Sequence, residues 1–323
     1  MCTLILAWRV FEEAPICVAA NRDEAVDRPS SPPSVREGDP RVVAPRDEEA
    51  GGTWIGYNEH DVLVAVTNRW VEGDGDRSRG LLVDDALASP SARDAIAGVE
   101  AELDARRYAP FHLLAVDGDD CILVEHGGTL VGGDGPGVTT DGSDRSGEAT
   151  LEGVRPGGET LGGGEADGET LGGGEADGET LEGDGTGGAT RTPSARRGDP
   201  EGVGQPSAEY AIHAFEPGVH VVVNVGFDGA WFVPSARPEV GRRQAANATR
   251  IHDRLTPQAG ETAGAWTRRA GEMLGDHEYG VCIHGDGFGT RSSSLIRLGD
   301  ERVYEFADGP PCETPYRLVE AMI

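Results

Sequence analysis

Short hydrophobic runs in the first and last parts of the chain predict strands, and a tight connection joins the first two runs. These two extend from Thr3 to Phe11 and from Pro15 to Ala20, with Glu12-Glu13-Ala14 between them, so they predict an antiparallel hairpin. After an expected loop from Pro29 to Ala50, Gly51-Gly52-Thr53-Trp54 opens another strand. Further runs predict strands at 62–67, 111–116, 121–126, 210–215, 219–223, 280–284, 292–298 and 302–306.

Apolar residues at helical spacing predict helices at Arg79–Leu87, Ser91–Ala105, Arg242–Leu255 and Glu261–Leu274. Strands therefore come first, helices follow, and strands return at the end, without a one-by-one alternation. This order favours a layered α+β body over a parallel α/β sheet.

The predicted hairpin makes Cys2 a candidate nucleophile. Counting back from a turn near Glu13 places Cys2 opposite Arg22, Asp23 and Glu24. Because Cys2 is small, we expect Met1 to be removed, which leaves a thiol and an α-amine on one residue. An amine with a pKa near ~8 can take the thiol proton, and the arginine and the carboxylates can favour the thiolate and orient the amine. The alternative is a buried, inert cysteine that only begins a strand.

Several short motifs resemble one protein family along most of the chain. They are Met1-Cys2-Thr3-Leu4, Ala19-Ala20-Asn21-Arg22-Asp23-Glu24, Gly51-Gly52-Thr53-Trp54, Val66-Thr67-Asn68-Arg69, Ser78-Arg79-Gly80 and Gly289-Thr290-Arg291-Ser292-Ser293-Ser294. Together they resemble the NRDE family, also known as the transport and Golgi organisation protein 2 family. This resemblance implies an α+β fold of the N-terminal-nucleophile hydrolase type, a four-layer αββα sandwich with mainly antiparallel sheets.

The layout implied by the resemblance is similar to that of the cysteine branch containing penicillin V acylase and bile-salt hydrolase. Carried over residue by residue, it gives as catalytic candidates Cys2, Arg22, Asp23, Asn68, Asn224 and Arg291. Asn68 and Asn224 each end a predicted strand, where an amide can stabilise an oxyanion or accept from the amine. Asparagines at strand ends are equally ordinary turn formers. The substrate-binding candidates are Asn21, Glu24, Trp54 and Arg69.

Two functions from different classes follow from the motifs and the resemblance. The first is a cysteine amidohydrolase that acts on a linear C–N amide bond with Cys2 as nucleophile. The second is a non-catalytic carrier or trafficking protein for haem or lipid, in which haem would be cargo. In both, the partner is a small molecule with amide or apolar character, and we expect no cofactor.

The composition indicates one domain over residues 1–323, and an insert at residues 133–207 interrupts it. The insert contains the repeat Gly162–Leu171, which recurs at once as Gly172–Leu181, and it is rich in glycine and acidic residues. Such a segment cannot bury enough apolar area to offset its ordering entropy, so we expect disorder. Sixteen Asp or Glu against five Arg give the insert a net charge of −11 and leave −18 for the rest.

The five cysteines are scattered and odd in number, which fits a reducing cytoplasm better than a disulfide framework. Cys282 and His284 alternate onto one face of a predicted strand, and two ligands do not make a metal site, so we interpret them as core residues. No hydrophobic run approaches the roughly 20 residues that span a bilayer. The start of the chain lacks the pattern of a secretory signal.

The net charge of the whole chain is −29, and all of its 28 basic residues are arginines. This acidity disfavours binding to nucleic acid. A lysine-free, carboxylate-rich sequence instead resembles proteins of salt-loving microbes, where concentrated cations screen the repulsion between carboxylates.

We therefore expect the protein to melt at a lower temperature in dilute buffer than in molar potassium chloride, because less salt leaves its carboxylates to repel one another. Thermal melts at the two salt concentrations measure the difference. Equal melting temperatures would remove the halophilic interpretation.

Overall fold

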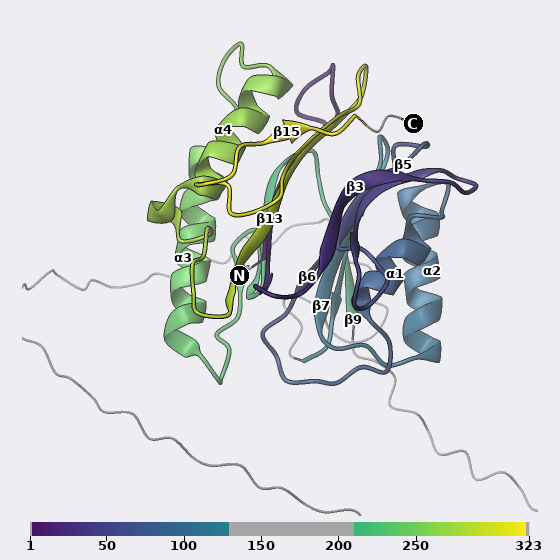
Figure 1. Ribbon diagram of the computed structural model, residues 1–323, viewed down its shortest axis with the longest axis vertical. Helices are drawn as coiled ribbons and strands as arrows, with labels where there is room; N and C mark the ends of the chain where they lie inside the picture. Colours follow the sequence, from purple (N-terminus) through teal and green to yellow (C-terminus); the bar gives the residue numbers. More distant parts are fainter. Residues whose placement is uncertain (1, 129–209, 321–322) are drawn as a thin grey trace, which may run out of the picture. The chain divides into compact units, whose positions relative to one another are not determined.

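The computed structural model describes residues 2–128, 210–320 and 323 (Figure 1), which all belong to one compact unit. The insert predicted at 133–207 lies outside these residues. The last strand before the gap and the first one after it pair with each other, with His126 opposite Tyr210. In the sequence, the insert therefore connects two strands that are neighbours in one sheet.

Two sheets form the centre of the fold, and all of their strand pairs are antiparallel. Sheet A has eight strands, in the spatial order β12 (Ala230–Trp231), β11 (Gly226–Phe227), β10 (Gly218–Val223), β1 (Thr3–Trp8), β2 (Ile16–Ala25), β13 (Phe288–Leu298), β14 (Val303–Ala307) and β15 (Arg317–Leu318). Sheet B has seven, in the order β3 (Ser30–Arg36), β4 (Val42–Asp47), β5 (Ile55–Asn58), β6 (Leu63–Asn68), β7 (Phe111–Val116), β8 (Cys121–His126) and β9 (Tyr210–Ala214).

Helices cover the outer face of each sheet. Helices α3 (Pro238–Arg254) and α4 (Ala263–Gly275) lie on sheet A, and α1 (Arg79–Ala86) and α2 (Ala92–Ala105) lie on sheet B (Figure 1). A short 3-10 helix, η1 (His277–Tyr279), follows α4. The predicted four-layer αββα sandwich and its four helices are confirmed, with shifts of a few residues at the helix ends.

Strand β1 shows how the sequence specifies these layers. It is buried along its whole length. Leu4 and Leu6 pack into the core between the two sheets, whereas Ile5 and Ala7 pack beneath α3 and α4. A strand that buries both faces needs a continuous apolar run. Each buried leucine or isoleucine contributes about 1.5–3 kcal/mol of transfer free energy.

The structure corrects two predicted elements. The segment Pro29 to Ala50 is not a loop but contains β3 and β4, and β3 tolerates Pro32 and Pro33 because it lies at the edge of sheet B. The strand predicted at Gly280 to His284 is absent apart from one isolated bridge between His284 and Gly289. Gly280 adopts the left-handed conformation with φ 61°, which ends η1 and turns the chain away from a strand.

The register of the first hairpin is as predicted. Thr3 pairs with Asn21, so the chain direction brings Cys2 to the level of Arg22 and Asp23. Strand β2 continues to Ala25, so the segment Asn21-Arg22-Asp23-Glu24 lies inside the strand and not in the loop after it. Strand β13 pairs with the other edge of β2 and fixes that part of it from both sides.

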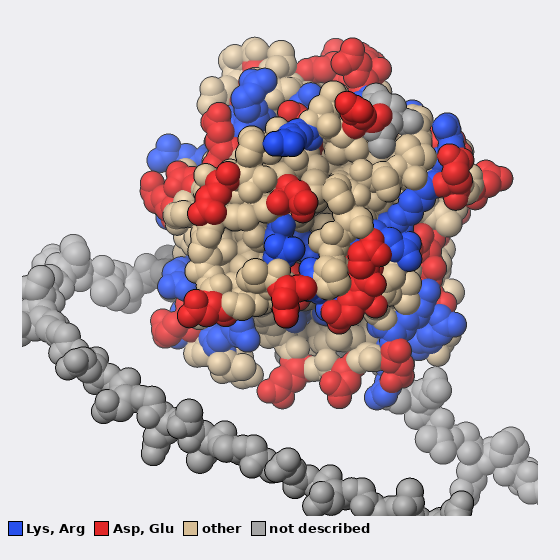
Figure 2. Space-filling view, viewed as in Figure 1, with Lys and Arg blue, Asp and Glu red and all other residues tan. Residues whose placement is uncertain are grey.

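Acidic residues and arginines are interspersed on the face shown in Figure 2, without a broad patch of arginine. Within the described residues, no helix is both long enough and apolar enough to cross a bilayer.

Candidate active site

Cys2 opens into a small cavity, with a volume of about 130 Å³, that is lined by residues of both sheets and the start of α1. Its lining consists of Cys2, Arg22, Asp23, Glu24, Arg28, Asp47, Thr53, Trp54, Val66, Asn68, Ser78, Arg79 and Gly80. An apolar hollow of about 30 Å³ adjoins it between the sheets and shares Cys2, Arg22 and Trp54. Cys2 therefore lines both a charged cavity and an apolar one.

The Cys2 side chain is half-buried, and its Sγ lies 3.7 Å from the backbone oxygen of Asp23. Burial raises the pKa of the thiol, and the nearby Asp23 carboxylate raises it further. Because only the thiolate is a strong nucleophile, chemistry at Cys2 calls for a base that removes the thiol proton.

Asp23 is held by the neighbouring strand. Its Oδ1 accepts a hydrogen bond of 2.6 Å from the Thr290 hydroxyl, and the two residues are register partners between β2 and β13. Burial raises the pKa of the Asp23 carboxyl. The Asp23 carboxyl is therefore fixed beside Cys2, and it takes up a proton more readily than an exposed aspartate does.

The guanidinium of Arg22 is held in the cavity by contacts with Trp54 and Asp47. Its guanidinium lies 4.2 Å from the centroid of the Trp54 ring, and its Nη2 lies 2.9 Å from Asp47 Oδ2. Only 5% of the residue is exposed. Its Nη1 is buried and has no hydrogen-bond acceptor among the described residues. A buried donor without a partner is costly, so this atom is suited to a ligand oxygen.

Asp47 binds two arginines of the cavity, and no sequence pattern singles it out. Besides Arg22, it binds Arg28, whose Nε lies 2.7 Å from Oδ2, and it accepts from the backbone nitrogens of Glu49 and Ala50. Glu24 also lines the cavity, 4.0 Å from both arginines. Trp54, a predicted substrate-binding residue, also lines the cavity.

Arg79 is a second residue that sequence reasoning passed over, although Ser78-Arg79-Gly80 is among the family-like motifs. It lines the cavity at the start of α1, and its Nη1 donates to the Pro110 carbonyl at 2.9 Å. It forms no ion pair with another described residue. The loop before Trp54 packs closely on this helix end, because a Cβ on Gly52 would lie 2.1 Å from the Gly80 carbonyl carbon. Both Trp54 and Arg79 are thereby fixed.

The two predicted asparagines have different positions. Asn68 ends β6 and lines the cavity. Asn224 follows Val223, the register partner of Thr3, so it is level with Cys2 on the other side of β1. Its buried amide donates to the Asn68 carbonyl at 2.6 Å, accepts from Gln244 Nε2 at 2.9 Å and does not line the cavity, so its catalytic role stays a prediction.

Three more candidates do not line the charged cavity. Arg69 has a fully buried side chain that pairs with Glu125 at 2.8 Å, so it is a core residue and not a substrate contact. Arg291 lines a separate surface hollow, which also contains His284. The amide nitrogen of Asn21 donates to the carbonyls of Leu274 and Val281 and so joins β2 to the helical layer. Arg69 and Arg291 line neither of the two cavities at Cys2, whereas Asn21 lines the apolar hollow, so its role in substrate binding stays a prediction.

The interpretation of Cys282 and His284 as two core residues also needs correction. Cys282 is buried, but His284 is exposed, because the predicted strand that would have turned both inward is absent. The two side chains lie together with two further residues that sequence spacing did not single out.

The model of the Transport and Golgi organisation 2 family matches residues 1–130, which confirms the expected resemblance over that part of the chain. No curated protein matches the chain. Among solved structures, it is similar to penicillin V acylase from Agrobacterium tumefaciens, with 13% identity, a TM-score of 0.43, and coverage of 95% of this chain and 83% of that one. It is also similar to the Caenorhabditis elegans ortholog of N-acylethanolamine-hydrolyzing acid amidase, with 10% identity, a TM-score of 0.46, and coverage of 91% and 92%. At these values the likeness is no argument about activity.

We expect Asp47→Asn to lower the free energy of unfolding by about 3 kcal/mol at neutral pH, because it leaves the Arg22 guanidinium buried without its ion-pair partner. Burial alone would raise the pKa of Asp47, but hydrogen bonds from Arg28 and the Ala50 backbone, with the charges of Arg28 and Arg22, lower it overall. The ion pair therefore stabilises the folded state above the unfolded pKa of about 3.9 and is lost as the pH falls through the lower folded-state pKa.

Urea titrations of both proteins across this pH range measure the effect. The difference in unfolding free energy should be largest near neutral pH and shrink in acid. Asp61→Asn is the matched control, since the Asp61–Arg302 pair is partly exposed and should contribute less than about 1 kcal/mol. A difference for Asp47→Asn that does not vary with pH would contradict this account.

Proposed function

We propose that this protein is an N-terminal cysteine amidohydrolase, which hydrolyses the C–N bond of a linear amide with Cys2 as nucleophile after removal of Met1. The observation that supports this most strongly is the convergence of Cys2, Arg22 and Asp23 on one cavity, where the buried Arg22 Nη1 lacks an acceptor among the described residues.

In the proposed first half-reaction, the α-amine of Cys2 takes the thiol proton and the sulfur attacks the amide carbonyl carbon. The raised pKa of the thiol makes this base necessary. Collapse of the tetrahedral intermediate breaks the C–N bond, and the α-ammonium returns its proton to the leaving nitrogen. The products are a free amine and a thioester between the acyl group and Cys2.

In the second half-reaction, the α-amine takes a proton from water, which attacks the thioester carbonyl. The carboxylic acid leaves and the sulfur recovers its proton. Asp23 holds the α-ammonium during both steps, since its carboxylate is fixed beside Cys2 by Thr290. Asp23 is thus an orienting group and not the base.

The oxyanion formed in each step needs donors that are already in place. Arg22 Nη1 is such a donor, because stacking on Trp54 and the bond to Asp47 hold the guanidinium rigidly. Asn68 and Arg79 line the same cavity and supply further donors.

The size of the cavity limits the substrate. A volume of about 130 Å³ lies well below the roughly 300–1,000 Å³ of pockets that enclose drug-sized ligands. The cavity therefore holds the amide group and its nearest atoms, and the remainder of the substrate extends outside. Arg79, which forms no ion pair with another described residue, favours a polar or anionic group close to the amide.

A carrier of haem or lipid is the alternative that the family resemblance implies. A surface hollow of about 720 Å³ beside β3 and β15, with Phe306 and Leu318 in its lining, has the volume for an apolar small molecule. The cavity at Cys2 does not. Under this alternative, haem would give a saturable absorbance change that does not depend on Cys2.

Our first test concerns Cys2 itself. We expect intact mass to show loss of Met1, and iodoacetamide to label Cys2 as found by peptide mapping, which separates it from the exposed Cys312. Cys2→Ala should abolish release of aminomethylcoumarin from N-acyl aminomethylcoumarin amides and the acyl adduct on the protein. Cys17→Ala, in the core beneath the helices, is the matched control and should keep both. Retained Met1 with an unlabelled Cys2 would contradict the proposal and favour the carrier.

A second test concerns Arg22. We expect Arg22→Lys to lower kcat by about 10²-fold with little change in KM, since lysine keeps the charge but cannot hold Asp47 while presenting a second fixed donor to the oxyanion. Arg36→Lys, whose ion pair with Asp84 lies outside the cavity lining, should leave kcat unchanged. Thermal melts establish that both variants fold. An unchanged kcat in folded Arg22→Lys would remove Arg22 from the oxyanion site.

A further inference from the structure

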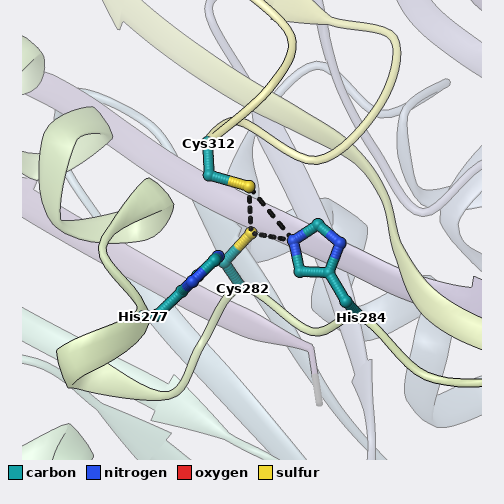
Figure 3. A group of neighbouring side chains, drawn as sticks. All are labelled: His277, Cys282, His284 and Cys312. Atoms are coloured by element: carbon teal, nitrogen blue, oxygen red, sulfur yellow. Dashed lines mark hydrogen bonds between the residues drawn. The ribbon is translucent and has the colours of Figure 1, made fainter.

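Two histidines and two cysteines meet at the surface near the start of β13 (Figure 3). His277 belongs to η1, Cys282 and His284 lie on the segment between η1 and β13, and Cys312 comes from the connection between β14 and β15. One ligand atom of each of the four lies within 4.8 Å of those of the other three. Three of the four residues are exposed, so ions in solvent have access to the group.

The distances among Cys282, His284 and Cys312 fit coordination by one ion, and His277 completes the group within 4.8 Å. The Sγ atoms of Cys282 and Cys312 lie 3.5 Å apart, and His284 Nε2 lies 3.6 Å from the first sulfur and 3.1 Å from the second. Bond lengths of about 2.3 Å to sulfur and about 2.0–2.1 Å to nitrogen place tetrahedral zinc ligands about 3.4–3.8 Å from one another. The two sulfurs are also much farther apart than the roughly 2.0 Å of a disulfide bond.

The surrounding chain holds these ligands independently of one another. The Ile283 nitrogen donates to Thr290 Oγ1 at 2.9 Å, and the Thr290 nitrogen donates to the Ile283 carbonyl at 2.9 Å, which fixes the segment with Cys282 and His284. Gly275, at the end of α4, allows the loop with Cys312 to approach, because a Cβ there would lie 3.3 Å from the Cys312 nitrogen. Binding an ion therefore requires little reorganisation of the backbone.

The second ring nitrogen of His284 lies near a carboxylate, as is common for a histidine that binds a metal. Its Nε2 faces the sulfurs, whereas its Nδ1 lies 4.0 Å from Glu313 Oε1. A histidine that binds a metal through one ring nitrogen commonly donates from the other to a carboxylate, which sets its tautomer. A small side-chain rotation of Glu313 would complete that bond.

We propose that His277, Cys282, His284 and Cys312 bind one Zn²⁺ ion in a structural site. Two thiolates and two imidazoles in a tetrahedron suit zinc, whereas calcium and magnesium require oxygen ligands. With four protein ligands no position is left for water or substrate, so the ion is structural and not catalytic. It joins the Cys312 loop to the segment that pairs, through Thr290, with Asp23 of the Cys2 cavity. The inference does not rest on the proposed hydrolase activity.

The test uses the full chain, treated with a chelator and a reductant and then reloaded with Zn²⁺ or Co²⁺. Metal analysis after dialysis should find one Zn²⁺ per chain, and Co²⁺ should give the visible bands of a tetrahedral ion with a thiolate charge-transfer band. Cys282→Ser and Cys312→Ser should lose the bound ion and the charge-transfer band. Zn²⁺ should raise the melting temperature of the wild type and not of these variants.

Matched controls separate this site from other thiols and histidines. Cys2→Ser and His252→Asn, the latter an exposed histidine of α3, should each retain one Zn²⁺. The proposal is overturned if the reduced wild type binds no Zn²⁺, if Co²⁺ gives a six-coordinate spectrum without a charge-transfer band, or if Cys2→Ser loses the ion. It is also overturned if Cys282 and Cys312 are joined by a disulfide in protein isolated under reducing conditions.

Discussion

The ion pair between Arg22 and Asp47 is the interaction on which the cavity depends. Arg22 lies on β2 of sheet A, and Asp47 ends β4 of sheet B, so their bond joins the two sheets beside Cys2. The ring of Trp54 covers the guanidinium and shields this charge pair from water. Taking two charges out of water is expensive, and the additional hydrogen bonds to Asp47 help to offset that cost. Because Nη2 of Arg22 is bound to Asp47, its Nη1 is left as a fixed donor that can bind a ligand oxygen.

The part of this arrangement that depends on local sequence was predictable. A short connection fixes the register of β1 and β2, so Cys2, Arg22 and Asp23 could be placed together from residue order alone. The four helices and most strands also follow from periodicity, since each buries one continuous apolar face or two. The layered architecture is a consequence of these elements and of their order.

The remainder depends on pairing between distant segments, for which single residues carry no signal. Asp47 belongs to the strand pair of β3 and β4, which the sequence does not reveal. Pro32 and Pro33 indicate a loop there, although the edge of a sheet accepts proline. Asn224 ends a strand as predicted, yet only the packing of sheet A against α3 decides that its amide meets Gln244 and not the cavity. The Cys and His cluster escapes recognition because Cys312 lies far along the chain and arrives through the connection that follows β14.

The position of β1 in the interior of sheet A has a consequence for the order in which the protein matures. Its neighbours are β2, which follows at once, and β10, which begins only at Gly218; β2 in turn needs β13, which begins at Phe288. Pairing across such separations is slow, since the chain must close large loops before the contacts form. During synthesis, β1 therefore waits for β10, and β2 waits for β13, before both edges of each strand are paired.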